Sequence, residues 1–171
     1  MAVYIYINVA FSATVYIRDF EPNGKFLIFA PFLVAWVTDT FAYFTGRFFG
    51  KHKLIPAVSP KKTVEGAIGG TIFGTLSIVL AAFILERFFN PNNEFMANYV
   101  VILICGVLIS FVGQVGDLIM SVIKRNYKIK DYGNFFPGHG GMLDRFDSIS
   151  AVSVTLGAIF MFASLVGISF I

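Results

Sequence analysis

Residues 99–147 read YVVILICGVLISFVGQVGDLIMSVIKRNYKIKDYGNFFPGHGGMLDRFD and contain the change in composition that decides the fold. The run from Tyr99 to Ile123 is almost entirely apolar, and about 20 such residues suffice for a helix that crosses a bilayer. Basic residues, aspartates, glycines and one histidine then dominate as far as Asp147. Charged groups are costly in hydrocarbon, so a polar cluster between two apolar runs is either a water-exposed loop or a functional site. This composition favours a site.

The rest of the chain is as apolar as the first part of that stretch. Hydrophobic residues make up 57% of the chain and charged residues 13%, whereas a soluble domain carries about 25% charged residues. The composition therefore predicts an integral membrane protein. We expect an all-α fold, a polytopic helical bundle that forms a single membrane-embedded domain over residues 1–171. Five helices are expected to span the membrane: Ala2–Ile17, Phe26–Phe49, Gly66–Phe89, Tyr99–Ile123 and Ser148–Ile171.

The basic residues predict how these spans are oriented. With five spans, the second and fourth connections lie on one face of the membrane, and that face receives ten of the 13 lysines and arginines. Such an excess marks the cytoplasmic side, so we expect both polar loops in the cytoplasm, in a bacterial inner membrane. The net charge of +3 comes without a nucleic-acid motif, so anionic lipid headgroups and phosphates are the expected partners and nucleic acid is not. The single cysteine, Cys105, is expected to be a small buried apolar residue.

The end of the fourth span has a polar face. Asp117, Ser121 and Lys124 follow one another at helical spacing, which places them on one side of the helix. An isolated aspartate would be costly here, so we expect Asp117 to face a polar cavity and to have a cation as its partner. Asp144 and Asp147 are three residues apart and would also share a helix face. Three converging carboxylates match the oxygen ligands that Mg²⁺ prefers.

Ordinary ion pairs explain the same spacing equally well. Asp117 could pair with Lys124 or Arg125, and Asp144 could pair with Arg145. The glycines of PGHGGMLD, residues 137–144, favour a site because glycine lets the backbone approach a ligand closely. Turn formation in a solvated loop remains the alternative for these glycines. His139 could bind phosphate, transfer a proton or cap the loop.

A second polar connection lies between the second and third spans. Ser59-Pro60 starts a turn, Lys61 and Lys62 supply adjacent cations, and Thr63 can cap a helix that begins near Gly66. Lysines at a helix start have the wrong sign for the helix dipole, and a bound phosphate would resolve that conflict. A basic loop that only orients the protein is the alternative.

One aspartate lies within a span rather than beside one. Asp39 is in the second span, which carries no lysine. We expect its partner on another helix or through a cation.

These polar residues together resemble the signature of the phosphatidate cytidylyltransferase family, also called the CDP-diacylglycerol synthases. The resemblance rests on residues 39–50, on SPKKTVEG at 59–66, and on SxxKR, KD, PxHGG and DRxD within residues 121–147. It covers the chain from about Trp36 to the C-terminus. A pattern with so many fixed polar positions is highly specific.

The resemblance implies a reaction in phospholipid biosynthesis. CTP and phosphatidic acid would give CDP-diacylglycerol and pyrophosphate, with Mg²⁺ required and a second cation left open. It implies a nucleotidyltransferase whose partners are CTP, phosphatidic acid and the bilayer, with a homodimer as one candidate assembly. Members of the family usually carry further spans before the matched part, so we expect this chain to correspond to the C-terminal part of a longer architecture.

The resemblance also implies roles for individual residues. The catalytic residues would be Asp117, Lys124, Asp144 and Asp147, and the three aspartates among them would be the metal ligands. The substrate-binding residues would be Ser59, Lys61, Lys62, Thr63, Ser121, Arg125, His139, Gly140, Gly141 and Arg145.

Two other classes of protein would use some of the same groups. A CTP-dependent lipid-alcohol kinase of the dolichol kinase type would transfer the γ-phosphate to an alcohol and release CDP instead of pyrophosphate. A transporter, or a non-catalytic fragment, could carry intramembrane carboxylates. The two polar loops on one face fit a transporter poorly, because a path through the membrane needs polar residues at every depth.

Overall fold

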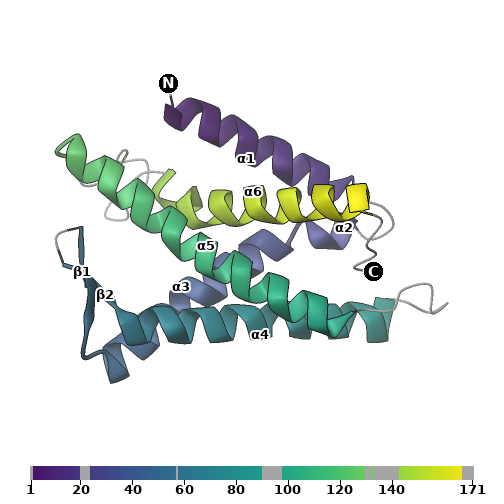
Figure 1. Ribbon diagram of the computed structural model, residues 1–171, viewed down its shortest axis with the longest axis horizontal. Coiled ribbons are helices and arrows are strands. Elements are labelled where there is room, and N and C mark those ends of the chain that lie inside the picture. Colours follow the sequence, from purple (N-terminus) through teal and green to yellow (C-terminus); the bar gives the residue numbers. More distant parts are fainter. Residues whose placement is uncertain are drawn as a thin grey trace.

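A computed structural model describes residues 2–19, 24–56, 58–89, 98–129, 132 and 143–166, and of residues 2, 89, 143–145 and 166 it describes the backbone only. The described chain forms mainly helices, with one short β-hairpin (Figure 1). The elements are α1 (Ala2–Arg18), α2 (Gly24–Leu27), α3 (Ala30–Phe49), β1 (Lys53–Ile55), β2 (Ser59–Thr63), α4 (Val64–Phe89), α5 (Tyr99–Asn126) and α6 (Leu143–Val166).

Four stretches of described helix are long and apolar enough to cross a membrane. They are Gly24–Phe49, Val64–Phe88, Tyr99–Asn126 and Phe146–Leu165. α1 has 17 residues and forms a fifth, slightly shorter apolar helix. The prediction of a polytopic helical membrane protein is therefore confirmed, and over the described residues each expected span coincides with a helix to within five residues. Residues 167–171 of the fifth expected span lie outside the described part. The second span differs in one respect, because a turn at Ile28 and Phe29 separates α2 from α3.

The helices pack in a chain of neighbours. α3 lies against α4, α4 against α5, α5 against α6, and α6 against α1. Successive long helices run in opposite directions, so the hairpin, the last turns of α3 and α5 and the first turns of α4 and α6 gather at one end of the bundle (Figure 1). We call this the polar end. The helix ends that flank the second and fourth connections thus lie at the same end of the bundle, as the loop assignment predicted.

Small residues allow the helices to touch at their backbones. A Cβ atom on Gly70 would lie 2.8 Å from the carbonyl oxygen of Thr38, and one on Gly116 would lie 2.3 Å from the Cβ of Ala151. These separations are shorter than van der Waals contact, so only glycine fits at either position. Gly70 brings α4 onto α3, and Gly116 brings α5 onto α6, as is common where helices pack in a membrane.

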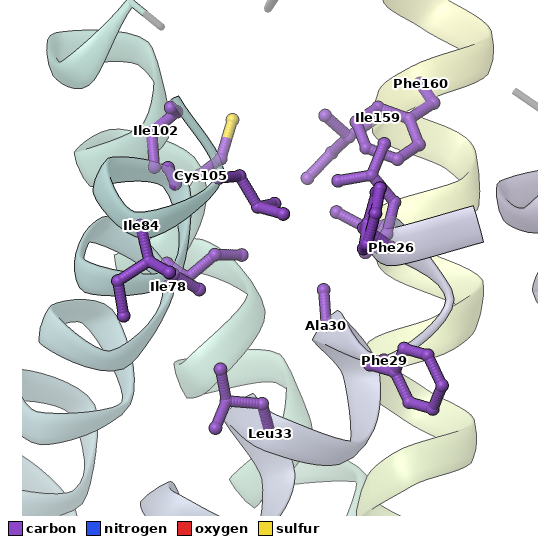
Figure 2. Close-up of a pocket in the computed structure, with 15 residues that line it drawn as sticks. Phe26, Phe29, Ala30, Leu33, Ile78, Ile84, Ile102, Cys105, Ile159 and Phe160 are labelled. Atoms are coloured by element: carbon purple, nitrogen blue, oxygen red, sulfur yellow. The ribbon is translucent and has the colours of Figure 1, made fainter. Parts of the chain in front are cut away.

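An apolar cavity of about 320 Å³ lies among the ends of the helices away from the hairpin (Figure 2). Phe26 and Leu33 line it from one side, and Ile78 and Cys105 from the other. Cys105 is half-buried among apolar side chains, which agrees with its expected role as a small apolar residue.

The β-hairpin was not predicted. Its strands pair antiparallel, with Lys53 opposite Thr63 and Ile55 opposite Ser59. The sequence SPKKT has a single β-branched residue, Thr63, and lacks the alternation that predicts a strand. The hairpin also moves the start of α4 from the expected Gly66 to Val64.

Contacts at the base of the hairpin explain how so polar a segment is held. The backbone N–H of Val64 donates to the His52 carbonyl at 3.0 Å. The backbone N–H of His52 donates to both carboxylate oxygens of Glu65 at 3.2 Å, and its ring Nδ1 lies 2.7 Å from one of them. His52 and Glu65 therefore close the loop between α3 and α4.

The contact at Gly116 predicts a compensating pair of substitutions. Gly116→Ala should lower the stability of the bundle by about 1–3 kcal/mol, because the new methyl group overlaps that of Ala151. Adding Ala151→Gly should restore most of that loss, because it removes the overlapping atom. Thermal unfolding in detergent, followed by size-exclusion chromatography, measures both effects.

Gly106→Ala is the matched control. Its Cβ would lie 2.9 Å from Cγ2 of Ile78 and 3.0 Å from Cγ2 of Thr75. This overlap is milder than the 2.3 Å approach to Ala151, so we expect a smaller loss of stability. Equal losses at Gly106 and Gly116, or no recovery in the double variant, would contradict the proposed backbone contact.

Candidate functional site

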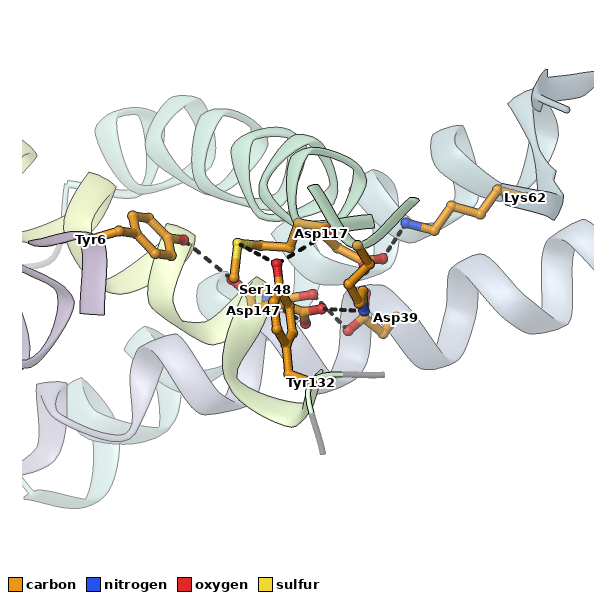
Figure 3. Close-up of polar contacts among 9 residues, drawn as sticks. Tyr6, Asp39, Lys62, Asp117, Tyr132, Asp147 and Ser148 are labelled. Atoms are coloured by element: carbon orange, nitrogen blue, oxygen red, sulfur yellow. Dashed lines mark hydrogen bonds and ion pairs between the residues drawn. The ribbon is translucent and has the colours of Figure 1, made fainter. Parts of the chain in front are cut away.

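Three aspartates from three membrane helices gather at the polar end. Asp39 comes from α3, Asp117 from α5 and Asp147 from the first turns of α6 (Figure 3). Asp147 is 6% exposed, so its carboxylate is removed from water. Asp117 is partly exposed and Asp39 is exposed, and each of the three carboxylates has a hydrogen bond or a cation as its partner.

Lys62 supplies the cation for Asp117. Its ammonium, at the end of a side chain from β2, donates to the Asp117 carboxylate and forms an ion pair with it (Figure 3). The side chains of Lys62 and Asp117 are 31% and 21% exposed. The predicted cation partner of Asp117 is therefore confirmed. It comes from the second polar loop, and not from Lys124 or Arg125 as the ion-pair alternative proposed.

Lys124 lies against the second carboxylate. Its Nζ is 3.9 Å from Oδ2 of Asp147, and both side chains are about a tenth exposed. The same ammonium lies 5.5 Å from the ring centre of Tyr132, at cation–π distance. A buried lysine between a carboxylate and an aromatic face is held in place, as a residue that neutralises charge in a reaction must be. Ser121 lies on the same helix, between Asp117 and Lys124, and is half-buried.

Asp39 joins α3 to α6. Its Oδ2 accepts a hydrogen bond from the Ser148 hydroxyl at 3.1 Å. The backbone N–H of Ser148 donates to Oδ1 of Asp147 at 2.8 Å, so one residue contacts both carboxylates. The expected partner of Asp39 on another helix is therefore found. Asp39 itself was noticed in the sequence but not included among the site residues, although an aspartate within an apolar span was a sufficient signal.

A cavity of about 640 Å³ opens beside these carboxylates, between α3, the hairpin, α4 and α5. Asp39, Asp117 and Lys62 line it together with Lys61, Thr63 and Ser59 from the predicted site. Residues that the sequence did not single out complete it, and they include Tyr43, Arg47, Lys53 and Gln114. The lining thus combines carboxylates with four cationic side chains, which is the chemistry that suits a polyphosphate and a metal ion.

The hairpin and the start of α4 fix the cationic side of the cavity. The hydroxyl of Thr63 accepts a hydrogen bond from the backbone N–H of Gly66 at 3.1 Å, which confirms Thr63 as the cap of α4. A Cβ on Gly50 would lie 2.7 Å from the methyl group of Thr63, so the end of α3 packs closely on β2. These contacts hold the strand that carries Lys61 and Lys62 against the membrane helices.

Several predicted site residues lie outside the described part. His139, Gly140 and Gly141 are among them, as are the side chains of Asp144 and Arg145. The backbone of Asp144 lies in the first turn of α6, three residues before Asp147, so the helical spacing assumed for this pair is present. Arg125 is an exposed residue in the last turn of α5. Among the described contacts, Arg125 makes none with the three aspartates or with Lys62 and Lys124.

The carboxylates offer the hard oxygen ligands that suit Mg²⁺, but they do not form a ready-made shell. Among the described residues, no group of three metal-ligating side chains lies close enough to hold an ion. Lys62 and Lys124 contact two of the three carboxylates. The carboxylate oxygens are of the type that a divalent ion takes as ligands, and such an ion would share Asp117 and Asp147 with the two lysines.

Comparison with known proteins identifies the family of the chain. Residues 1–164 match the model of the Cytidylyltransferase family. The match begins at residue 1, so the similarity extends further toward the N-terminus than the motifs from Trp36 onward indicated.

Curated bacterial proteins are similar over most of the chain. The phosphatidate cytidylyltransferase of Bacillus subtilis (strain 168) is 42% identical over 144 residues, which are 84% of this chain and 51% of the relative. That of Staphylococcus haemolyticus (strain JCSC1435) is 41% identical over 147 residues, 86% of this chain and 52% of the relative. The chain spans about half the length of the curated relatives that it matches. With a family match over nearly its whole length, the chain belongs to the cytidylyltransferase family.

Proposed function

We propose that this chain carries the catalytic site of a phosphatidate cytidylyltransferase, which makes CDP-diacylglycerol from CTP and phosphatidic acid. The observation that carries the proposal is the polar end of the bundle, where three helix carboxylates, two paired lysines and a cation-lined cavity lie together. The relatives named above are phosphatidate cytidylyltransferases, and their name supports the same substrates. A site at the end of membrane helices suits a substrate whose phosphate lies at headgroup depth and whose tails stay in the bilayer.

The reaction is an in-line displacement at phosphorus. A phosphate oxygen of phosphatidic acid attacks the α-phosphorus of CTP and forms a new P–O bond. The bond from the α-phosphorus to the bridging oxygen of the β-phosphate breaks, and its electrons leave with pyrophosphate. Such a reaction is accelerated mainly by positioning and by neutralising charge, so no covalent nucleophile from the protein is needed.

The described side chains can be assigned to these tasks. Arg47, Lys53 and Lys61 line the cavity and would bind the β- and γ-phosphates of CTP. Lys62 and Lys124, next to the carboxylates, would bind the phosphates that react. The family's other polar motifs, including His139, Gly140, Gly141 and Arg145, belong to the proposal through the resemblance alone.

Mg²⁺ is part of the proposal. Asp117 and Asp147 would hold it, together with Asp144. When bound, the ion would withdraw charge from the phosphoryl oxygens and from the leaving pyrophosphate. The role of the protein in this step is to present the carboxylates beside Lys62 and Lys124. The charge of Asp147, which is buried, counts for more than it would in solution.

The proposal also places the site in the cell. The polar end as a whole carries eight of the eleven lysines and arginines whose side chains are described, and such a face is cytoplasmic by the positive-inside rule. They are Arg47, Lys51, Lys53, Lys61, Lys62, Lys124, Arg125 and Lys128. CTP is made in the cytoplasm, and the relatives are bacterial, so we assign the site to the cytoplasmic side of the inner membrane. A homodimer is the assembly to be tested, by light scattering in detergent.

The product of the reaction tests the proposal directly. Purified protein in detergent, given labelled CTP, phosphatidic acid and Mg²⁺, should form a lipid-soluble cytidine product and release one pyrophosphate for each. Release of CDP without lipid-bound cytidine would instead show a lipid kinase. No turnover by this chain, with turnover by a full-length relative under the same conditions, would contradict independent activity.

Asp117→Asn and Asp147→Asn should each lower turnover about 100-fold or more, because each removes a charge that stabilises the reacting phosphates and their metal ion. Asp144→Asn should behave in the same way if its side chain completes the set. The measurement is the initial rate at saturating Mg²⁺. Asp19→Asn is the matched control, since Asp19 pairs with Arg18 at the opposite end of the bundle. Near-normal rates in the Asp117 or Asp147 variants would remove that residue from the site.

The two adjacent lysines should have different effects. Lys61→Ala should raise the apparent KM for CTP about tenfold with a smaller change in kcat, because Lys61 lines the cavity without a described carboxylate partner. Lys62→Ala should instead lower kcat, because it leaves Asp117 without its cation.

Lys51→Ala serves as the control for the lysine pair, since Lys51 is exposed and is not among the residues that line the cavity. Cysteine-accessibility mapping beside the assay checks that each variant is inserted correctly. Altered insertion with unchanged kinetics would reduce both lysines to an orienting role.

A further inference from the structure

An apolar groove lies on the other side of the α5 and α6 pair. It has a volume of about 340 Å³ and lies between α1, α5 and α6. Val112, Ile119 and Met120 line it from α5, and Val154 lines it from α6. Tyr6 and Thr155 are its hydroxyl-bearing residues, and both hydroxyls are already used. Tyr6 donates to the backbone carbonyl of Asp147 at 3.4 Å, and Thr155 donates within its own helix at 2.8 Å. The groove therefore offers apolar surface to a ligand.

The groove follows the direction of a lipid tail. Its lining residues on α5 extend from Val112 to Ile123, and eleven steps along a helix advance about 16 Å. Half of a bilayer's hydrocarbon core is about 15 Å thick, so the groove has the depth of one leaflet. Because α5 crosses the membrane and the groove follows α5, the long direction of the groove is perpendicular to the membrane surface. The groove begins near the polar end and extends into the bilayer.

The groove ends beside the catalytic groups. Ile123 at its outer end immediately precedes Lys124, whose ammonium lies 3.9 Å from Asp147. Tyr132, whose ring faces Lys124, donates to the backbone carbonyl of Met120 in the groove wall at 3.4 Å. A molecule with its tail in the groove would therefore have its head at the depth of Lys124 and Asp147. A positive group at the end of an apolar channel fits an anionic lipid.

We propose that this groove binds one acyl chain of the lipid substrate and that Lys124 binds the phosphate of the same molecule. The inference rests on the proposed function and adds to it the side from which the lipid reaches the site. The volume of the groove lies in the range of small-molecule sites. By contrast, the cavity of Figure 2 lies away from the polar end, and nothing around it indicates an occupant.

The position of the groove also fits the geometry of the reaction. Gly116 and Ala151 bring α5 and α6 into contact, which separates the groove from the cavity lined by Asp39 and Asp117. The lipid and the nucleotide would then reach the carboxylates from opposite sides of this helix pair. In-line displacement is compatible with that arrangement, because the attacking oxygen and the leaving pyrophosphate lie on opposite sides of the α-phosphorus.

Chain-length selectivity tests the groove. Val112 lies at its deep end, and Val112→Phe should shorten it while leaving the end near Lys124 open. We expect kcat/KM for dioleoyl phosphatidic acid to fall about tenfold or more, while that for dioctanoyl phosphatidic acid stays within about twofold of the unsubstituted protein. Val107→Phe is the matched control, because Val107 is on the same helix, is 44% exposed and does not line the groove. Equal losses with both lipids, or the same selectivity in the Val107 variant, would overturn the proposal.

A binding measurement separates the groove from the reaction. Phosphatidic acid with a diazirine at the end of one acyl chain should, on illumination, label residues 112–123 of α5 or 151–155 of α6. Excess dioleoyl phosphatidic acid should suppress this labelling, and Val112→Phe should weaken it. Labelling of the groove by a protein that shows no turnover would support the groove and contradict the proposed function. Labelling elsewhere, or a Val112 variant that changes only the oligomeric state in light scattering, would show that another occupant covers this face.

Discussion

The ion pair between Lys62 and Asp117 is the contact on which the rest of the polar end depends. It joins a strand outside the helices to the middle of the apolar α5, across 55 residues of sequence. Removing one partner of a fully buried pair costs about 3–5 kcal/mol, because the other charge is left without compensation. The cost is smaller here, since the two side chains are 31% and 21% exposed, but its direction is the same. The negative charge of Asp117 in an apolar helix needs a cation, and Lys62 supplies it. This ion pair therefore holds the hairpin against the bundle.

The other two carboxylates extend the same constraint. Asp147 lies near Lys124, and Asp39 shares Ser148 with it, so α3, α5 and α6 are tied together at one depth in the membrane. The polar contacts oppose the tendency of each helix to slide along its neighbour, while the glycine contacts bring the backbones close enough for those short side chains to meet. Stability and a concentrated set of charges thus come from the same contacts. These fixed carboxylates and lysines are suited to holding phosphates, since the side chains need not rearrange when a negatively charged phosphate binds.

The sequence predicted the parts of this structure that depend on composition and spacing. Apolar runs long enough to cross a bilayer gave the helices, and the basic connections indicated which loops lie together. Asp117 could be assigned a cation because an aspartate in an apolar helix needs one. Its partner could not be identified in advance, because Lys124 and Arg125 were nearer in the sequence than Lys62. That choice is made by the hairpin, whose second strand, SPKKT, lacks the alternation that predicts a strand. The hairpin is held by His52 and Glu65 at its base. Arg47, Lys53 and Gln114 were missed for the same reason, since only tertiary packing brings them to the cavity.

The position of α5 shows how one helix can serve both substrates of the proposed reaction. Asp117 and Gln114 face the polar cavity, while Val112, Ile119 and Met120 face the apolar groove. The polar face and the apolar face of α5 stay separate only if α6 packs closely against α5 between them. Gly116 allows that close packing at Ala151. A bulkier residue at position 116 would push α6 and Asp147 away from α5 and its Lys124, and would open the barrier between groove and cavity at the same time. The smallest residue in this turn therefore constrains the depth of the reacting groups and the separation of the lipid side from the nucleotide side.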